Sequence, residues 1–349
     1  MKTIALVWWW TWWHIYPLIS VYNSCENIED LSFIWFWERN SLEESIAKEN
    51  DIEFVSIKSW KLRRYFDFKN FIEPLKNILW FFQSVFYLFH FNVDVVFSKW
   101  GYVSIPVCIA AKLLRKKIYI HESDIVWGAS NKIVWRFADK IFYSFDNEKI
   151  DNEKHILSWQ IVNPELLKWI NREISTKENE KLEVVVVWWS QGSTIIFESI
   201  LKIIKTLNWV NLTIILWSKN LHFREKFEEY SFVTIYDYID QKELWKIYKQ
   251  TDIAITRWWA TTLWELYFFG IHSIIIPLKS AAQNHQELNA KYFENEVWSN
   301  ILDEDKNLDL ELFRLLTKFQ KLRKSWLNLW WFNYASERIK KELIKKDKN

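Results

Sequence analysis

The stretch TIALVWWWTWWH, residues 3–14, decides the fold. Its first part, TIALV, is a short apolar run typical of a strand buried inside a parallel sheet. Its second part places five tryptophans around Thr11, where the chain has to leave that strand. Tight turns after strands use Gly, Asn, Asp, Ser or Pro, because bulky residues reach positive φ only at a cost. The tryptophans therefore stand where a glycine-rich loop is expected.

The composition of the whole chain shows the same anomaly. Glycine occurs 4 times and tryptophan 26 times in 349 residues, whereas glycine alone normally makes up about 7% of a protein. Further tryptophans follow other apolar runs, at Trp159, Trp188, Trp189, Trp217, Trp258 and Trp259. We interpret most tryptophan letters as UGA codons that are read as glycine. Trp35, Trp135 and Trp264 lie inside strand- or helix-like patterns and are the best candidates for genuine tryptophan.

Charge and cysteine usage exclude several classes of protein. The 46 basic and 44 acidic residues give a formal net charge of +2, which does not indicate nucleic-acid binding. Cys25 and Cys108 match no metal or disulfide spacing and fit a reducing compartment. The apolar start has no signal-peptide pattern, and no apolar run reaches the roughly 18–20 residues of a membrane span. We expect a cytosolic or peripheral protein without a metal or cofactor.

Strand-like and helix-like segments alternate in both halves of the chain. Buried strands are predicted at 3–7, 31–36, 52–57, 93–99, 117–123 and 140–145, and again at 183–187, 211–216, 232–238, 252–257 and 272–278. This alternation predicts an α/β protein with two doubly wound parallel sheets. We expect Rossmann-like domains at 1–160 and 161–325, and a C-terminal helix in 326–349 that packs back on the first domain.

With glycine at the suspect positions, residues 8–14 read GGGTGGH and connect a strand to a helix. The backbone N–H groups of such a loop, together with the positive end of the next helix, bind phosphate or pyrophosphate. His14 closes the loop and is a candidate general base or a partner for a sugar hydroxyl. Capping or packing at the helix start is the alternative role for this histidine.

Seven sequence blocks carry a family resemblance. They are WWTWWHIYP (9–17), SWKLRRYF (59–66), SKWGYVSIPV (98–107), HESDIVWGASNKI (121–133), VVWWSQGS (186–193), ITRWWATTLWEL (255–266) and QNHQELNA (283–290). In this order the blocks resemble the MurG family of peptidoglycan N-acetylglucosaminyltransferases, part of glycosyltransferase family 28. The resemblance spans most of the chain and implies a GT-B fold, with two Rossmann-like domains whose parallel sheets face each other across a cleft.

The resemblance also implies a reaction and a set of site residues. The C4 hydroxyl of the N-acetylmuramyl sugar of lipid I attacks C1 of UDP-GlcNAc, UDP leaves, and lipid II forms with inversion. His14 is the candidate catalytic base. Donor contacts are implied for Thr11, Trp12, Trp13, Asp124, Asn163, Ser190, Gln191, Ile239, Ala260, Thr261, Thr262, Leu263, Trp264, Glu265 and Gln286. Acceptor contacts are implied for His14, Tyr102, His121 and Glu122.

Some of these assignments have structural alternatives. Glu265, expected to accept hydrogen bonds from ribose hydroxyls, could be a surface carboxylate, and Gln286 could be a helix cap. Glu122 and His121 could form an ion pair at a strand end. Asn163 stands where the family usually has an arginine that holds the donor, and asparagine supplies no fixed positive charge.

A lipid acceptor raises the question of membrane contact. Residues 76–91, KNILWFFQSVFYLFHF, are strongly apolar and follow the basic residues Lys61, Arg63 and Arg64. This combination fits peripheral docking on the inner face of the cytoplasmic membrane. A helix buried against the N-terminal sheet is the alternative.

The expected partners are therefore UDP-GlcNAc, undecaprenyl-linked lipid I and the membrane surface, with no nucleic acid. The rival functions are another GT-B enzyme that uses UDP-sugars, such as a lipid glycosyltransferase or a UDP-GlcNAc 2-epimerase. If the tryptophans are literal, the rival is an inactive or non-catalytic protein that binds carbohydrate or membranes.

Overall fold

The computed structural model divides the chain into two compact units. Unit 1 comprises Met1–Pro164 and Asn333–Asn349, and unit 2 comprises Glu165–Phe332. The structure describes residues 1–7, 12–25, 28–37, 42–57, 73–99, 101, 104–146, 152–163, 165–166, 169–170, 181–187, 194–257, 259–278, 285–297, 299–304, 307–322 and 335–345. The domain boundaries expected from the sequence, after residues 160 and 325, lie a few residues from these divisions.

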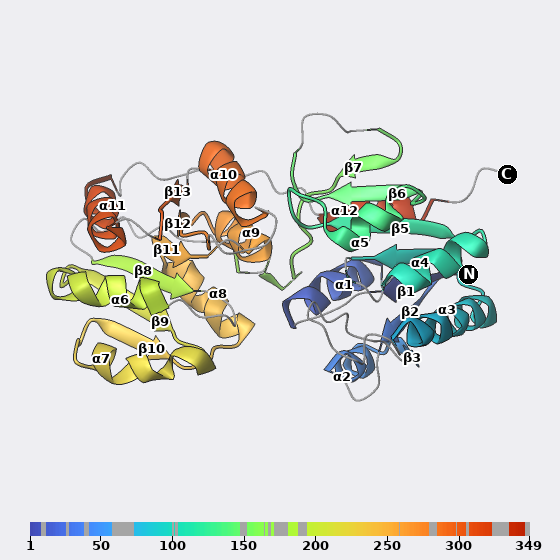
Figure 1. Ribbon diagram of the computed structural model, residues 1–349, viewed down its shortest axis with the longest axis horizontal. Helices are drawn as coiled ribbons and strands as arrows, with labels where there is room; N and C mark the ends of the chain where they lie inside the picture. Colours follow the sequence, from blue (N-terminus) through green and yellow to red (C-terminus); the bar gives the residue numbers. More distant parts are fainter. Residues whose placement is uncertain are drawn as a thin grey trace. The chain divides into compact units, whose positions relative to one another are not determined.

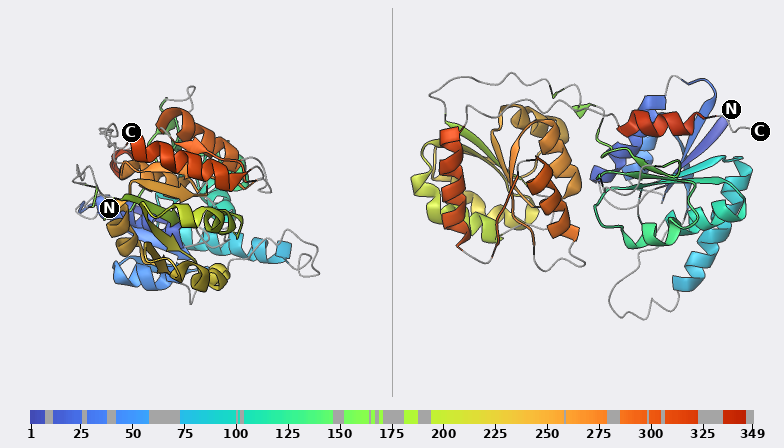
Figure 2. Two further views of the ribbon diagram at one scale, coloured as in Figure 1. Left: turned by 90° about the vertical axis from the view of Figure 1, so that its left-hand side faces the viewer. Right: turned by 90° about the horizontal axis from the view of Figure 1, so that it is seen from above.

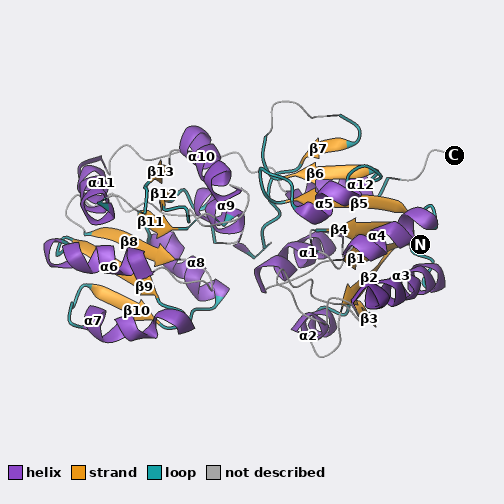
Figure 3. Ribbon diagram, viewed as in Figure 1, coloured by secondary structure: helices purple, strands orange, loops and turns teal. Residues whose placement is uncertain are grey.

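Unit 1 is built on one parallel sheet with the strand order β3-β2-β1-β4-β5-β6-β7 (Figures 1 and 3). Its strands are β1 Lys2–Val7, β2 Leu31–Trp37, β3 Glu53–Ser56, β4 Val95–Ser98, β5 Lys117–Glu122, β6 Lys140–Tyr143 and β7 His155–Leu157. Its helices are α1 Trp12–Cys25, α2 Leu42–Glu49, α3 Glu73–His90, α4 Ser104–Leu113, α5 Ala129–Val134 and α12 Ala335–Leu343.

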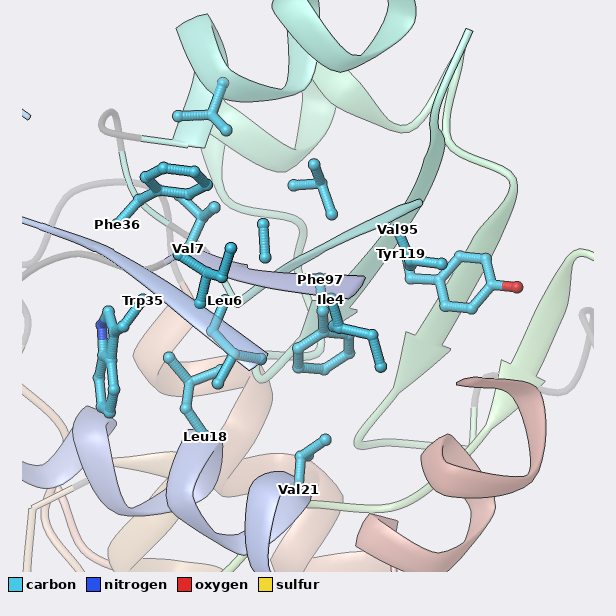
Figure 4. Packing of buried hydrophobic residues seen from close by; sticks show 14 of the residues in the cluster. Ile4, Leu6, Val7, Leu18, Val21, Trp35, Phe36, Val95, Phe97 and Tyr119 are labelled. Atoms are coloured by element: carbon cyan, nitrogen blue, oxygen red, sulfur yellow. The ribbon is translucent and has the colours of Figure 1, made fainter. Parts of the chain in front are cut away.

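The core of unit 1 explains why its strands are apolar runs rather than alternating patterns. In β1, Ile4 through Val7 are all fully buried, because α1 and α12 cover one face of the sheet while α3 and α4 cover the other (Figure 2). Leu18 and Val21 of α1 pack under this strand (Figure 4). A strand buried on both faces is expected to read as a continuous hydrophobic run.

Unit 2 repeats the architecture with the strand order β10-β9-β8-β11-β12-β13, again parallel. Its strands are β8 Leu182–Val187, β9 Val210–Ile215, β10 Val233–Tyr236, β11 Ile253–Thr256, β12 His272–Ile275 and β13 Asn300–Ile301. Its α-helices are α6 Thr194–Ile203, α7 Arg224–Glu228, α8 Gln241–Gln250, α9 Ala260–Phe268, α10 His285–Val297 and α11 Leu308–Leu322, with 3₁₀ turns η3 Ile204–Thr206 and η4 Ser218–Phe223. Helices α6 and α11 pack together on one face of this sheet (Figure 2).

The predicted α/β class, with two doubly wound parallel sheets, is confirmed. Every strand predicted from an apolar run is present within a few residues of its expected bounds. Strand β13 and helix α11 were not predicted. β13 has only two residues, which is too short for any periodicity to be visible.

The backbone at two tryptophans is unusual for a residue with a large side chain. Trp159 has a φ of 67°, and Trp217 has a φ of 59° with a ψ of 162°. The conformation of Trp217 borders a region that is populated almost only by glycine. Both residues follow strands in the positions where the sequence pattern predicts glycine.

Candidate functional site

Each sheet has one point at which the direction of strand addition reverses. This point lies between β1 and β4 in unit 1 and between β8 and β11 in unit 2. Ligands of doubly wound sheets bind outside the carboxyl ends of the strands at such a switch point. The connections that leave these four strands contain the first and second tryptophan-rich loops, the SKWGYVS block and the ITRWWATT block. Many of the predicted site residues therefore belong to the two switch points.

In unit 1 the first switch-point connection leads into α1. Trp12, Trp13 and His14 form the first turn of this helix, where N–H groups without helical partners favour an anion. Their side chains lie outside the described part of the structure, and so do Thr11 and Tyr102. The roles predicted for these residues stay predictions.

Glu122, at the end of β5, organises the loop that follows it. The buried carboxylate accepts hydrogen bonds from the backbone N–H of Asp124 at 3.1 Å, the backbone N–H of Gly128 at 3.0 Å and the side-chain amide of Asn131 at 2.9 Å. Burial and then the charge of Asp124 raise the pKa of this carboxyl. Glu122 therefore holds the Asp124 loop against the start of α5.

The neighbouring His121 has different partners. Its Nε2 lies 3.2 Å from the carbonyl oxygen of Trp159 and 3.4 Å from the hydroxyl of Ser144. Burial, followed by the charge of Lys99, holds the pKa of this imidazole well below its ordinary value. The imidazole is therefore neutral. It forms no ion pair with Glu122, whose carboxylate accepts from Asp124, Gly128 and Asn131 among the described residues.

Lys99, the residue after β4, was not predicted as a site residue. Its side chain is 0% exposed. Desolvation lowers the pKa of its ammonium group to about 7, although the negative charges of Asp124 and Glu122 act to raise it. The only signal in the sequence is a lysine at the end of a predicted apolar strand, directly before a suspected glycine.

In unit 2 the predicted donor residues 260–265 form the start of α9, directly after β11. Glu265 is 2% exposed, so it is not a surface carboxylate. Its carboxyl accepts a hydrogen bond of 3.1 Å from the side-chain amide of Gln241, and burial raises its pKa to about 8. Ile239 lies two residues before Gln241 and is also buried. The fold thus brings the start of α8 beside Glu265.

The individual positions within α9 differ in what they can offer a ligand. Leu263 and Trp264 are buried in the core, and the Trp264 ring meets Phe293 edge to face at 5.2 Å. Ala260 and Thr262 are buried in the first turn, while Thr261 is partly exposed. Contacts to a ligand from this turn would therefore come mainly from backbone N–H groups and from Thr261.

Arg257 anchors the connection between β11 and α9. Its guanidinium donates to the carbonyl oxygen of Ile276 at 3.0 Å and forms an ion pair of 2.7 Å with Glu304. Both charged side chains are largely buried. No sequence pattern predicts this pair, which joins the residue after β11 to the segment after β13.

The remaining predicted residues are less well defined. Ser190 and Gln191 lie outside the described residues, and Gln286 is the second residue of α10, with a side chain that is not described. Asn163 is 7% exposed at the end of the first segment of unit 1. None of these positions contradicts its predicted role.

Two Rossmann-like units, each with a helix N-terminus at its switch point, define a GT-B type protein. Residues 11–143 match the glycosyltransferase family 28 N-terminal domain, and residues 184–333 match the family 28 C-terminal domain. The chain therefore belongs to glycosyltransferase family 28.

Curated relatives agree with this assignment. A UDP-N-acetylglucosamine--N-acetylmuramyl-(pentapeptide) pyrophosphoryl-undecaprenol N-acetylglucosamine transferase of Clostridium perfringens is 33% identical over 90% of this chain and 89% of its own. A protein of the same name from Borreliella burgdorferi is 30% identical over 94% of this chain and 89% of its own.

Solved structures share the fold. MurG of Acinetobacter baumannii superposes with a TM-score of 0.73 at 20% identity, covering 98% of this chain and 95% of that one. A UDP-GlcNAc 2-epimerase of Neisseria meningitidis superposes with a TM-score of 0.69 at 14% identity, covering 99% of this chain and 100% of that one. The fold alone therefore does not separate a transferase from an epimerase.

Proposed function

We propose that this protein transfers N-acetylglucosamine from UDP-GlcNAc to the C4 hydroxyl of the N-acetylmuramyl sugar of lipid I, which forms lipid II for peptidoglycan. The observation that carries the proposal is the identity of 30–33% over about nine-tenths of the chain to relatives named for this transfer. The matched family domains make the protein a hexosyltransferase.

The reaction requires a base, a leaving-group site and a rigid donor pocket. A bond forms between the acceptor oxygen and C1, the bond from C1 to the diphosphate breaks, and the hydroxyl proton passes to a base. His14, in the first turn of α1, is the proposed base. The N-terminus of α9 would stabilise the charge of the departing UDP without a metal ion.

Glu265 and Gln241 suit a nucleoside pocket. The carboxyl is buried beside the amide at 3.1 Å, and a buried polar group pays its desolvation cost only when its hydrogen bonds are made. A ribose hydroxyl that donates to the second carboxyl oxygen would complete this group. Ile239, two residues from Gln241, would then offer its backbone to the uracil edge.

The glycine interpretation of the tryptophan letters is part of this proposal. Indole rings in the loops after β1, β8 and β11 would fill the space that phosphates need. The positive φ angles of Trp159 and Trp217 support glycine at these two positions. With literal tryptophan in the loops, the expected result is an inactive protein.

Membrane association is proposed through one face of α3. Ile78, Leu79, Phe82, Phe86 and Phe89 are between 52% and 75% exposed. They fall within about a third of the helix circumference at 100° per residue, while Trp80, Ser84 and Leu88 on the opposite side are buried. The helix is thus both a core helix and an exposed apolar stripe. Lys61, Arg63 and Arg64, predicted to lie beside it, fall outside the described residues.

No helix in the described ranges is long and apolar enough to span a bilayer. We propose that the stripe lies on the cytoplasmic face of the membrane, where the lipid acceptor is presented. Binding to vesicles with anionic lipids tests this: a chain with F82S, F86S and F89S should lose flotation with the vesicles. L310S, an exposed leucine on α11 of unit 2, is the matched control and should float normally.

The decisive assay of the function uses a chain we call the loop-glycine variant, which carries W8G, W9G, W10G, W12G, W13G, W188G, W189G, W258G and W259G. Incubated with UDP-GlcNAc and a short-chain lipid I analogue, it should release UDP and yield a disaccharide-linked lipid. The unaltered tryptophan chain is the control and should show neither product. If the loop-glycine variant folds but releases no UDP in the presence of this acceptor, the proposed function is wrong.

The same assay separates the rival enzyme. An epimerase would convert UDP-GlcNAc without any lipid acceptor into its C2 epimer, which has the same mass. Mass analysis of the lipid together with NMR spectra of the sugar nucleotide therefore distinguishes the two reactions.

A further inference from the structure

Among the described residues, no hydrogen bond compensates the charge of the buried Lys99 ammonium group. The side chain is 0% exposed, and within the described part of the chain its Nζ has no hydrogen-bond partner. Both oxygens of the nearby Glu122 carboxylate already accept N–H groups from its own loop and from α5. Burying an ammonium group without an acceptor is strongly unfavourable. Such a group in a native protein needs an explanation, and a bound anion that supplies the missing acceptor is one.

The position of Lys99 in the sheet indicates where that ligand would bind. Lys99 directly follows β4, and its backbone N–H donates to the carbonyl oxygen of Val7, the last residue of β1, at 3.1 Å. β1 and β4 flank the switch point of unit 1. The next element after β1 is α1, a helix of 14 residues whose N-terminus also favours negative charge. The Lys99 ammonium group and the N-terminus of α1 are therefore two sources of positive charge at the same switch point.

We propose that Lys99 binds a phosphoryl group of the acceptor's diphosphate at the switch point of unit 1. The inference rests on the proposed function, which supplies an acceptor with a pyrophosphoryl-polyprenol. The donor's diphosphate is assigned to the corresponding switch point of unit 2, at the start of α9. Lysine is suited to this task because its compact ammonium group binds phosphate as a point charge.

The carboxylates around Lys99 are compatible with an anionic ligand. Burial raises the pKa of Glu122, which reduces the negative charge of this side chain near neutral pH. A bound phosphoryl group would in turn favour the charged form of the lysine, since an opposite charge raises the pKa of an ammonium group.

The test compares K99M with K112M in the loop-glycine variant. Lys112 is an exposed lysine near the end of α4 and serves as the matched control. K99M should raise the KM for a short-chain lipid I analogue by about tenfold or more, the loss expected for one charge-assisted hydrogen bond. The KM for UDP-GlcNAc should stay within about twofold, and K112M should change neither value.

Thermal stability gives a second readout that a merely structural lysine would not produce. Replacing a buried, unpaired charge with a hydrophobic side chain of similar length is neutral or stabilising, so the melting temperature of K99M should stay the same or rise. A lower melting temperature with an unchanged acceptor KM would mean that Lys99 only balances Asp124 and Glu122, and would overturn the proposal. A raised KM for UDP-GlcNAc alone would assign the lysine to the donor and overturn it as well.

Direct binding keeps this inference separate from the proposed function. Calorimetric titration with inorganic pyrophosphate needs no turnover. K99M should bind pyrophosphate about tenfold more weakly than its parent, the loop-glycine variant. If the parent chain transfers no sugar, the proposed function fails while this titration still reports on Lys99. If the parent transfers sugar and K99M matches it in both KM and pyrophosphate affinity, the Lys99 proposal alone fails.

Discussion

The substitution Glu265→Gln is expected to change how the stability of the protein depends on pH. Burial raises the pKa of Glu265 from 4.5 to about 8 in the folded state, so the folded protein holds a proton that the unfolded chain releases. Stability linked to this group is fully present below the unfolded pKa and is lost as pH rises through about 8. Glutamine carries no titratable proton, and its carbonyl oxygen still accepts from Gln241.

The magnitude follows from the size of the shift. A difference of roughly 3.5 pKa units corresponds to an upper limit of about 5 kcal/mol at 1.36 kcal/mol per unit. Relative to the parent chain, the variant should therefore gain up to several kcal/mol of unfolding free energy between about pH 5 and about pH 9.

Urea unfolding of the full chain at about pH 5 and at about pH 9 measures this gain. A local probe in unit 2 identifies the unfolding transition that involves this unit. Glu228→Gln, at an exposed carboxylate on α7, is the control. Its unfolding free energy should differ from that of the parent chain by the same amount at both pH values. The reasoning is refuted if the difference in unfolding free energy between Glu265→Gln and the parent chain is also independent of pH. Glu265 would then be ionised or solvated in the folded protein.

Four further substitutions test the backbone strain at Trp217, the packing of Trp245 and Ile339, and the ion pair of Arg257. Trp217→Gly should leave the unfolding free energy nearly unchanged, since relief of about 1–3 kcal/mol of backbone strain offsets the lost ring contacts. Trp245→Gly, in the buried face of α8, should cost about 3–5 kcal/mol in the same denaturation experiment. In the loop-glycine variant, Arg257→Ala should raise the KM for UDP-GlcNAc and lower the melting temperature, because Glu304 loses the cation that compensates its largely buried charge. An unchanged KM would show that the pair does not position α9. Ile339→Ala, at a fully buried position in α12, should destabilise unit 1 by about 2–5 kcal/mol in urea, and a cost below about 1 kcal/mol would mean that α12 packs only loosely.

The sequence predicts those parts of the fold that depend on local pattern. Runs such as EVVVV predict β8 because both faces of the sheet are covered, so nearly every side chain of the strand has to be apolar. Helix α11 escaped prediction although Leu308, Leu312, Leu316 and Phe319 recur at helical spacing and are buried.

The site was predicted where its residues stand in motifs and missed where it depends on pairing between distant segments. Glu265 belongs to a recognisable block, but its partner Gln241 lies 24 residues away on another helix. Arg257 and Glu304 are 47 residues apart. Lys99 looks like an ordinary charged residue in the sequence, and only the burial around it makes it unusual. Such features arise from the packing of elements, which no local pattern encodes.

The return of α12 to unit 1 has a consequence for how the protein is made. Lys2 in β1 donates to the carbonyl oxygen of Leu343 at 2.8 Å, and Glu342 of α12 pairs with Lys140 of β6 at 3.2 Å. The ribosome synthesises the seven strands of unit 1 first, yet this unit lacks the helix that covers α1 until unit 2 has also been translated. Domains generally fold as units during synthesis, so unit 2 has all of its segments before unit 1 does. A chain truncated after residue 332 and released from the ribosome should therefore hold a finished second unit and a first unit that still exposes apolar surface to chaperones.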